Sequence, residues 1–259
     1  MTPRRGFRIL RVQRKEYLTP HMLRIALSGD DLEDFPQNQE SANFKLVIPK
    51  PGQTEIPSPP WTDDDKPTIR TYTLRHFDVE NQEVIVDFMV YGEPGPGGQW
   101  AVDAKVGDPV GFAGPGPAKL PDEDADWYLI GGDMSALPAA SAILERLPKD
   151  AKGYAIFNVL SEDDIQNIDA PEGITFTWRI DPTPDVLAQG LIDAVASIDW
   201  LPGSPAVWIA GEGGAMREIR RIMKKEREVE RSRLYVSAYW EIGMNEDRHQ
   251  VVKRAELDD

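Results

Sequence analysis

Short runs that alternate apolar and polar residues recur through the first half of the chain and predict β-strands. Gly, Pro and Asp turns separate six such runs, which read FRILRVQRKEYL, MLRIALSG, NFKLVIP, IRTYTLRHF, EVIVDFMVY and DPVGFAG. Six strands at this spacing predict a small antiparallel barrel that is closed or nearly closed. The proline-rich insert KPGQTEIPSPPWTDDDKP is typical of a long surface loop.

The pattern changes near residue 120, after GPGPAKLPDEDADW. Apolar strand patterns now alternate with helical ones, in the order WYLIGGD, SALPAASAILERLP, GYAIFNVL, ITFTWRI, PDVLAQGLIDAVASI, AVWIAGEGG, AMREIRRIMKKEREVER and LYVSAYWEIG. Such alternation predicts a mainly parallel α/β sheet with ligands at the carboxyl ends of its strands. We therefore expect a β-barrel domain over residues 1–120 and an α/β domain with a C-terminal extension over residues 121–259. One economical use of this plan is a flavin on the barrel and a pyridine nucleotide on the second domain, although architecture alone does not establish a function.

Composition excludes several classes of function. The chain of 259 residues has a formal net charge of −15, which argues against nucleic acid or a membrane surface as a partner, because both need a basic footprint. It contains no cysteine, and its three histidines lie far apart, so we expect no metal held by the protein itself. It has neither an apolar stretch of membrane-spanning length nor a secretory signal, so we expect a cytoplasmic protein.

The run IRTYTLR concentrates cationic, aromatic and hydroxyl side chains in one short strand. Period-two alternation divides them between two faces, with Arg70, Tyr72 and Leu74 on one and Thr71, Thr73 and Arg75 on the other. A strand built only to pack would not alternate in this way. The alternative is a solvated edge strand with exposed arginines and a half-buried tyrosine.

The segment YGEPGPGGQWA, residues 91–101, is a second candidate site. Gly95, Gly97 and Gly98 leave the backbone bare, so main-chain N–H groups can approach an anion, and a short helix beginning at Gln99 would favour phosphate at its N-terminus. The spacing is not that of a Walker loop, and the alternative is a glycine-proline hairpin.

Together the two segments predict a cradle for a flavin dinucleotide. An arginine on one strand can make a bidentate contact with a pyrophosphate whose other side rests on a glycine loop. Tyr72 offers a flat π-face to a planar ring system, and Thr73 offers a hydroxyl or backbone N–H to a ring nitrogen.

Several blocks of the chain resemble a known family in their order and spacing. The blocks are RTYTLR, DFMVYGEPGPGGQWA, GDPVGFAGP, GGDMSALPA, AVWIAGE and SAYW, and the match extends from about residue 7 to residue 243. This ordered set is similar to the siderophore-interacting protein family of FAD-dependent, NAD(P)H-linked ferric-siderophore reductases. The resemblance implies a ferredoxin-reductase-like fold, with FAD on residues 1–120 and NAD(P)H on residues 121–259.

The resemblance also implies roles for single residues in FAD binding. Arg70 would contact the phosphates, Tyr72 would stack on the isoalloxazine ring and Thr73 would lie near N5, which makes Tyr72 and Thr73 the catalytic candidates. The other positions that match the family's FAD contacts are Leu74, Tyr91, Gly95, Gly97, Gly98, Trp100, Ala101, Asp133, Ser135 and Ala136.

Other positions bear on the nicotinamide nucleotide. The positions expected to contact it are Gly211, Glu212, Arg217 and Trp240. The basic helix after GEGG suggests that Arg217 or Arg220 favours a 2′-phosphate, although NADH, NADPH and a reduced ferredoxin all stay open as donors. The family pattern is not matched everywhere, since histidine is usual at Tyr91, Ala-Ser at Gly97-Gly98, and arginines at Glu241 and Ile242.

Substrate binding is implied for several cations. The family's pocket is rich in Lys and Arg, because ferric siderophores are often anionic or ringed by oxygens. Lys45 matches the pocket lysine, and the further candidates are Lys119, Arg233 and Lys253. For Lys119 and Lys253 the alternative is a surface lysine that extends into solvent.

The resemblance implies that electrons pass from NAD(P)H through FAD to Fe(III) in the bound siderophore. Oxygen ligands hold Fe(III) more tightly than Fe(II), so Fe(II) would be released in the cytoplasm, and the iron would be part of the substrate. One alternative is an FAD-dependent reductase that passes electrons to a ferredoxin or an oxygenase. Another is a siderophore-binding protein without catalysis.

Overall fold

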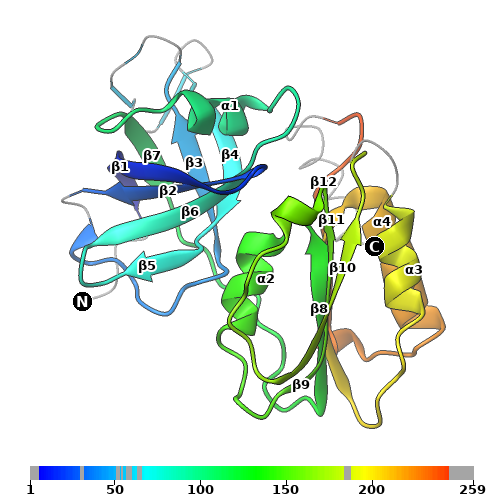
Figure 1. Cartoon of the computed structure of the whole chain (residues 1–259). Helices are drawn as coiled ribbons and strands as arrows, with labels where there is room; N and C mark the ends of the chain where they lie inside the picture. Colours follow the sequence, from blue (N-terminus) through cyan, green and yellow to red (C-terminus); the bar gives the residue numbers. More distant parts are fainter. Residues whose placement is uncertain are drawn as a thin grey trace. The chain divides into compact units, whose positions relative to one another are not determined.

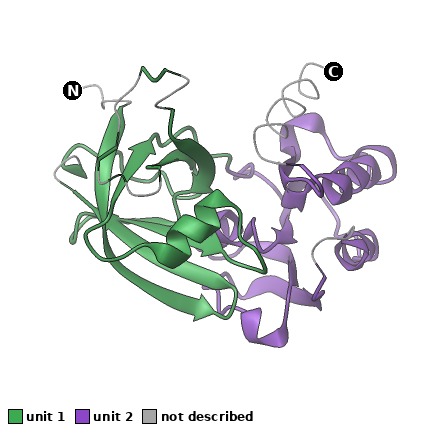
Figure 2. Ribbon diagram, turned by 90° about the horizontal axis from the view of Figure 1, so that it is seen from above, with its two compact units in different colours: residues 1–119 green, residues 120–259 purple. Residues whose placement is uncertain are grey.

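The computed structural model describes residues 6–29, 32–50, 53, 55–56, 60–62, 66–183 and 188–244. The chain divides into two compact units, residues 1–119 and residues 120–259, which Figure 2 shows in two colours. The predicted order of architectures, an antiparallel barrel-like sheet followed by a parallel α/β sheet, is confirmed. Among the described residues, no helix is long and apolar enough to span a bilayer.

The first unit is one antiparallel sheet (Figure 1). Its strands are β1 (Phe7–Thr19), β2 (Met22–Ser28), β3 (Asn43–Ile48), β4 (Thr68–Thr73), β5 (His76–Asp78), β6 (Glu83–Met89) and β7 (Pro109–Ala113). They lie in the order β4-β3-β7-β1-β2-β6-β5, and helix α1 (Pro96–Asp103) follows β6. Buried side chains from most of these strands form one apolar core, which includes Leu10, Leu46, Phe88 and Phe112.

The sheet has seven strands in place of the predicted six, because IRTYTLRHF forms both β4 and β5. The chain changes partners in the middle of this run. Leu74 N–H donates to Ala42 O at 2.8 Å, on the β3 side, whereas Arg75 N–H donates to Ile85 O at 3.0 Å, in β6. Since only Leu74 and Arg75 separate the two edge strands, the ends of the sheet meet at this corner, and an open strand order takes a barrel-like form.

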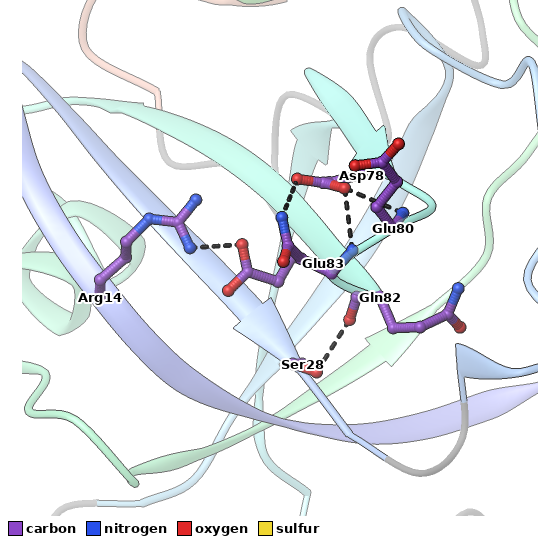
Figure 3. A network of polar contacts seen from close by, with 7 residues as sticks. Arg14, Ser28, Asp78, Glu80, Gln82 and Glu83 are labelled. Atoms are coloured by element: carbon purple, nitrogen blue, oxygen red, sulfur yellow. Dashed lines mark hydrogen bonds and ion pairs between the residues drawn. The ribbon is translucent and has the colours of Figure 1, made fainter.

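A polar network fixes the hairpin between β5 and β6 (Figure 3). The carboxylate of Asp78 accepts hydrogen bonds from the backbone N–H groups of Glu80 and Asn81, each at 3.0 Å, and from the Asn81 side chain at 2.7 Å. These bonds lower the pKa of Asp78, and the bond from the Asn81 backbone N–H has the largest effect. Arg14 on β1 forms an ion pair with Glu83 at the start of β6. The hairpin therefore sets the register of β6, which carries core residues behind the candidate site.

The second unit is a five-stranded parallel sheet with helices on both faces (Figure 1). Its elements are β8 (Trp127–Asp133), α2 (Leu137–Leu144), β9 (Lys152–Val159), β10 (Gly173–Ile180), α3 (Gln189–Ala196), β11 (Pro205–Glu212), α4 (Gly213–Lys225) and β12 (Leu234–Trp240). The strand order is β10-β9-β8-β11-β12, so the order reverses between β8 and β11. Helices α3 and α4 pack on one face around Leu129, Ile156 and Ile209, and α2 covers the other face.

Candidate functional site

The glycine loop leads into a helix whose first N–H groups have no partner among the described residues. Helix α1 begins at Pro96, three residues before the predicted start at Gln99, and its N-cap residue Gly95 has no side chain to cap it. Gln99 N–H makes the first helical bond, to Gly95 O at 2.9 Å. Proline has no N–H, so Gly97 and Gly98 carry the two first-turn donors, and neither has an acceptor within the described part of the chain. Two such N–H groups at a positive helix end suit an anion.

Tyr72 on β4 lies directly against this helix. A Cβ added to Gly97 would overlap the Tyr72 hydroxyl and would come within 2.9 Å of Tyr72 Cε2, so only glycine allows this approach. The Tyr72 ring also packs on Phe88 of β6, with the ring centroids 4.5 Å apart, and the Phe88 ring contacts Trp100 of α1. The structure thus brings the predicted aromatic residue and the predicted glycine loop together.

The alternation predicted for β4 can be read from its register with β3. Tyr72 is the partner of Phe44 and Arg70 is the partner of Leu46, so Arg70 and Tyr72 share a face. Arg70 is half-buried, and its Nη1 donates to the neighbouring carbonyl of Ile69 at 2.8 Å.

The other side chains of the first unit that were predicted to contact FAD differ in their solvent exposure. Thr73 is 8% exposed and lies on the face opposite Tyr72, and Ala101 of α1 is buried in the apolar core of the first unit. Tyr91 is exposed and contacts the His21 ring, with centroids 5.8 Å apart. Leu74 has no exposed surface, and its N–H and C=O are bonded to Ala42 and Ser41. These contacts give Leu74 a structural role, and its contact with the cofactor stays a prediction.

In the second unit, the carboxylate of Asp133 joins three segments at the carboxyl edge of the sheet. Its Oδ1 accepts from the Ser135 N–H at 2.9 Å and from the Ser135 hydroxyl at 2.5 Å. Its Oδ2 accepts from the Glu212 N–H and from Trp240 Nε1, both at 2.8 Å. Burial raises the pKa of Asp133, while the bonds from Ser135, Trp240 and Glu212 act to lower it.

Four donors fill the lone-pair directions of the Asp133 carboxylate. The buried side chain therefore holds Ser135, Glu212 and Trp240 in place, and its contact with the cofactor stays a prediction. Ala136, also predicted to lie by the cofactor, is fully buried and directly precedes α2, whereas Ser135 in the same turn is half-buried.

Two further contacts organise the start of α4. Glu212 caps the helix, because its Oε2 accepts from the Ala215 N–H at 2.8 Å. Gly211 has φ of +153°, and a Cβ there would lie 2.6 Å from Asp133 Oδ2. Arg217, the predicted nucleotide contact on the exposed side of α4, is paired with Glu241 at 2.8 Å.

The predicted substrate cations are divided between the two units. Lys45 is exposed on β3, with its Nζ 2.5 Å from the Thr71 hydroxyl, and Lys119 is exposed at the end of the first unit. Arg233 belongs to the second unit, where it precedes β12 at the amino edge of the sheet and pairs with Asp122 at 3.3 Å. Lys253 lies outside the described residues.

Two polar residues that sequence reasoning did not single out lie near the carboxyl edge of the second unit, Asn158 on β9 and Arg179 on β10. A signal for Asn158 was present, because it interrupts the apolar run AIFNVL. Arg179 follows Trp178 near the end of a predicted strand, which is where a parallel sheet binds its ligands.

Comparison with known proteins gives matches over both units. The family model described as siderophore-interacting FAD-binding domain matches residues 11–119, and the one described as siderophore-interacting protein matches residues 125–243. The ferric vibriobactin reductase ViuB of Vibrio cholerae is 34% identical over 97% of this chain and 96% of its own.

Solved structures show the same likeness. The siderophore-interacting protein SipS from Aeromonas hydrophila is 32% identical, with a TM-score of 0.86 over 98% of each chain. The ferredoxin reductase of carbazole 1,9a-dioxygenase has 16% identity and a TM-score of 0.63 over 90% of this chain and 67% of its own, which shows a shared fold alone. The predicted ferredoxin-reductase-like fold is therefore confirmed.

Proposed function

Because the chain belongs to the siderophore-interacting protein family, we propose that it is an FAD-dependent reductase of ferric siderophores that draws electrons from NAD(P)H. In this proposal residues 1–120 hold FAD and residues 121–259 hold the nicotinamide nucleotide. The siderophore is the partner, its iron is the substrate, and Fe(II) is released in the cytoplasm.

The observation that carries the proposal is the contact between Tyr72 and the first turn of α1. The unpartnered N–H groups of Gly97 and Gly98 suit the FAD diphosphate, and the bare backbone of this turn lets a large anion approach. Tyr72 lies against the same turn and offers an aromatic surface for the ring system. Arg70, on the same face of β4, supplies the positive charge that a diphosphate needs. The residues present therefore fit the group.

The chain has no cysteine and no redox-active group of its own, so FAD supplies the conversion of a two-electron donor into one-electron steps toward Fe(III). The residues of the chain bind the cofactor and the chelate and orient them. Arg70 holds the phosphates and Tyr72 fixes the plane of the ring. Because the Thr73 side chain lies on the opposite face of β4, its proposed contact with the ring edge is through the backbone N–H. Lys45 attracts an anionic chelate by its charge, and the Thr71 hydroxyl restricts where the ammonium lies.

The nucleotide is proposed to lie at the carboxyl edge of the second unit. The hydrogen bonds of Asp133 hold the turn at Ser135, the Gly211–Glu212 turn and the Trp240 indole as one surface. This surface begins between β8 and β11, where the strand order reverses and open α/β sheets bind their ligands.

One experiment tests the proposal and its rivals. The purified protein is loaded with FAD, and NADH or NADPH is added without oxygen, followed by a ferric hydroxamate chelate and an Fe(II) trap. A flavin absorbance that bleaches with the nucleotide and recovers as Fe(II) appears supports the reductase.

Two other outcomes would replace the proposal. Bleaching without recovery on the chelate, but with recovery on a ferredoxin, would make the chain a reductase for a protein acceptor. Binding of the chelate by a protein that cannot be loaded with FAD would make it a siderophore-binding protein without catalysis.

A further inference from the structure

Asn158 is a buried carboxamide that lacks a partner. It is 8% exposed, and its Oδ1 is buried without a hydrogen bond within the described part of the chain. Its Cα partners are Asp133 on β8 and Arg179 on β10, so the three residues form a row across adjacent strands near the carboxyl edge of the sheet. Buried amide oxygens are nearly always paired, so this oxygen, at the edge where a parallel sheet binds its ligands, is available to accept a hydrogen bond from a ligand.

Arg179 extends this row toward helix α3. It is exposed, and among the described residues it makes neither a hydrogen bond nor an ion pair. A Cβ added to Gly190, in the first turn of α3, would lie 3.7 Å from Arg179 Nε and 3.9 Å from Nη2. The guanidinium therefore lies beside the N-terminus of α3.

The N-terminus of α3 itself offers unused donors. Its N-cap residue, Ala188, has a methyl side chain that cannot cap a helix. The Leu191 and Ile192 N–H groups both donate to Ala188 O, at 3.1 and 3.2 Å. The N–H groups of Gln189 and Gly190 have no acceptor in the part of the chain that the structure describes. A guanidinium, two free N–H groups and a carboxamide together suit a phosphate carried on a sugar.

We propose that Arg179, the first turn of α3 and Asn158 bind the 2′-phosphate of NADPH and its ribose, and that they make NADPH the preferred electron donor. The inference rests on the proposed function, because it assigns the donor of that reaction. Arg179 and the Gln189 and Gly190 N–H groups take the phosphate, and the Asn158 oxygen accepts from the remaining ribose hydroxyl.

The strand order argues for the 2′-phosphate over the diphosphate that links the two halves of the nucleotide. A dinucleotide crosses the sheet where the order reverses, between β8 and β11, and its diphosphate lies near the turn after β8. Strands are spaced about 4.8 Å apart, so β10 is about 10 Å from β8, beyond the reach of a phosphate held at that turn. The adenosine lies over β9 in this arrangement, and its 2′ substituent extends to β10.

The two arginines first expected to read the 2′-phosphate are engaged elsewhere. Arg217 pairs with Glu241 at 2.8 Å, and a carboxylate beside it would repel a phosphate. Arg220 donates from Nη2 to Val236 O at 2.6 Å, in the middle of β12 and away from the carboxyl edge.

The test measures binding of two adenosine fragments to the FAD-loaded protein by calorimetry. Adenosine 2′,5′-bisphosphate carries the phosphate in question, and adenosine 5′-monophosphate lacks it. The variants are Arg179→Ala, Arg179→Lys and Arg217→Ala, and Arg221→Ala is the control, because it removes an equal charge from the exposed side of α4. The ratio of kcat/KM for NADPH to that for NADH is measured on the same proteins.

The expected result is a selective loss. The parent protein binds the bisphosphate more tightly, and Arg179→Ala weakens that binding by about 10- to 100-fold while changing monophosphate binding by less than about 3-fold. Arg179→Lys keeps part of the selectivity, and the NADPH/NADH ratio falls in parallel. Retained monophosphate binding shows that the variant is folded.

Three results would overturn the inference: a parent protein that does not favour the bisphosphate, an Arg179→Ala variant that weakens both fragments equally or neither, and a selective loss in Arg217→Ala instead. A failure of the proposed function can be distinguished from a failure of this inference. A protein that loses bisphosphate selectivity in Arg179→Ala but never reduces a ferric chelate keeps this inference and loses the reductase assignment.

Discussion

The Trp240 indole donates from Nε1 to Asp133 Oδ2 at 2.8 Å, and this bond joins the carboxyl ends of β8 and β12 across the strand between them. It passes over Gly211 of β11, where a Cβ would lie 2.6 Å from the same oxygen. A glycine is therefore needed at position 211 for the bond to form. The bond holds the Trp240 indole in place at one side of the proposed nucleotide site.

The buried Asp133 carboxyl gives a pH-dependent stability. Its folded-state pKa is raised above its usual value of 3.8, chiefly by burial, so the folded protein holds this proton more tightly than the unfolded chain. Its contribution to the free energy of unfolding is therefore full below pH 3.8 and falls as pH rises through the raised folded-state pKa. Asp133→Asn should remove this pH dependence. It should also lower the free energy of unfolding by about 1–3 kcal/mol, because the new amide N–H groups face donors that the carboxylate accepted from.

Urea unfolding of the parent and of Asp133→Asn between pH 4 and pH 8 measures the difference directly. The exposed Asp163→Asn serves as the control for loss of one carboxylate from the same unit. A stability difference that is constant across this pH range would show that Asp133 does not titrate as stated.

The contact between Tyr72 and Gly97 predicts a steric effect of a single methyl group. Gly97→Ala places a Cβ where the Tyr72 ring lies, so the ring must move or the helix must shift, at a cost of about 1–3 kcal/mol. Gly95→Ala is the matched control, since a Cβ there meets nothing within 4 Å and its φ of −60° suits alanine. Thermal unfolding of the FAD-free proteins should separate the two variants, and equal melting temperatures would contradict the geometry.

Removal of the Arg70 guanidinium should release FAD. A charge-assisted contact with a diphosphate supports an affinity loss of about 10- to 100-fold in Arg70→Ala, with little change in folding. Flavin content after gel filtration and titration of the FAD-free protein with FAD measure this loss. Arg11→Ala, an exposed arginine of the same unit bonded to Gly107 O, is the control. Full flavin content in Arg70→Ala would remove Arg70 from the phosphate site.

Most elements could be predicted because their signals are local. Apolar alternation and turn residues marked the strands, and Pro96, a residue favoured at the first helical position, was a signal for the start of α1 that the choice of Gln99 overlooked. The division between β4 and β5 gave no such signal, since alternation continues through Leu74 and Arg75 and only the change of partner strand separates them. Pairing of this kind is non-local.

In the candidate site, too, the features with a local sequence signal could be predicted and the non-local contacts could not. The glycines and Arg70 could be found from residue type, but the four donors to Asp133 come from three segments far apart in the sequence. Strand direction alone would have given the position of Arg233 within the second unit. It precedes the strand LYVSAYW, so it lies at the amino edge of a parallel sheet, whereas ligands bind at the carboxyl edge.

Lys45 and Arg233 should therefore respond differently to substitution. Lys45 is exposed and matches the pocket lysine of the family, so Lys45→Ala should raise KM for an anionic ferric chelate several-fold. It should leave flavin content unchanged, because Lys45 pairs with Thr71, on the face of β4 opposite Arg70 and Tyr72. Arg233→Ala should leave that KM unchanged, because its guanidinium is held by Asp122 and by Asp124 O at the other edge of the second unit's sheet. Steady-state kinetics with a ferric catecholate and a neutral ferric hydroxamate measure both effects, with Lys105→Ala as the control for an exposed lysine. A KM that rises in Arg233→Ala and not in Lys45→Ala would reverse the assignment, and equal effects on the two chelates would show that charge is not what Lys45 contributes.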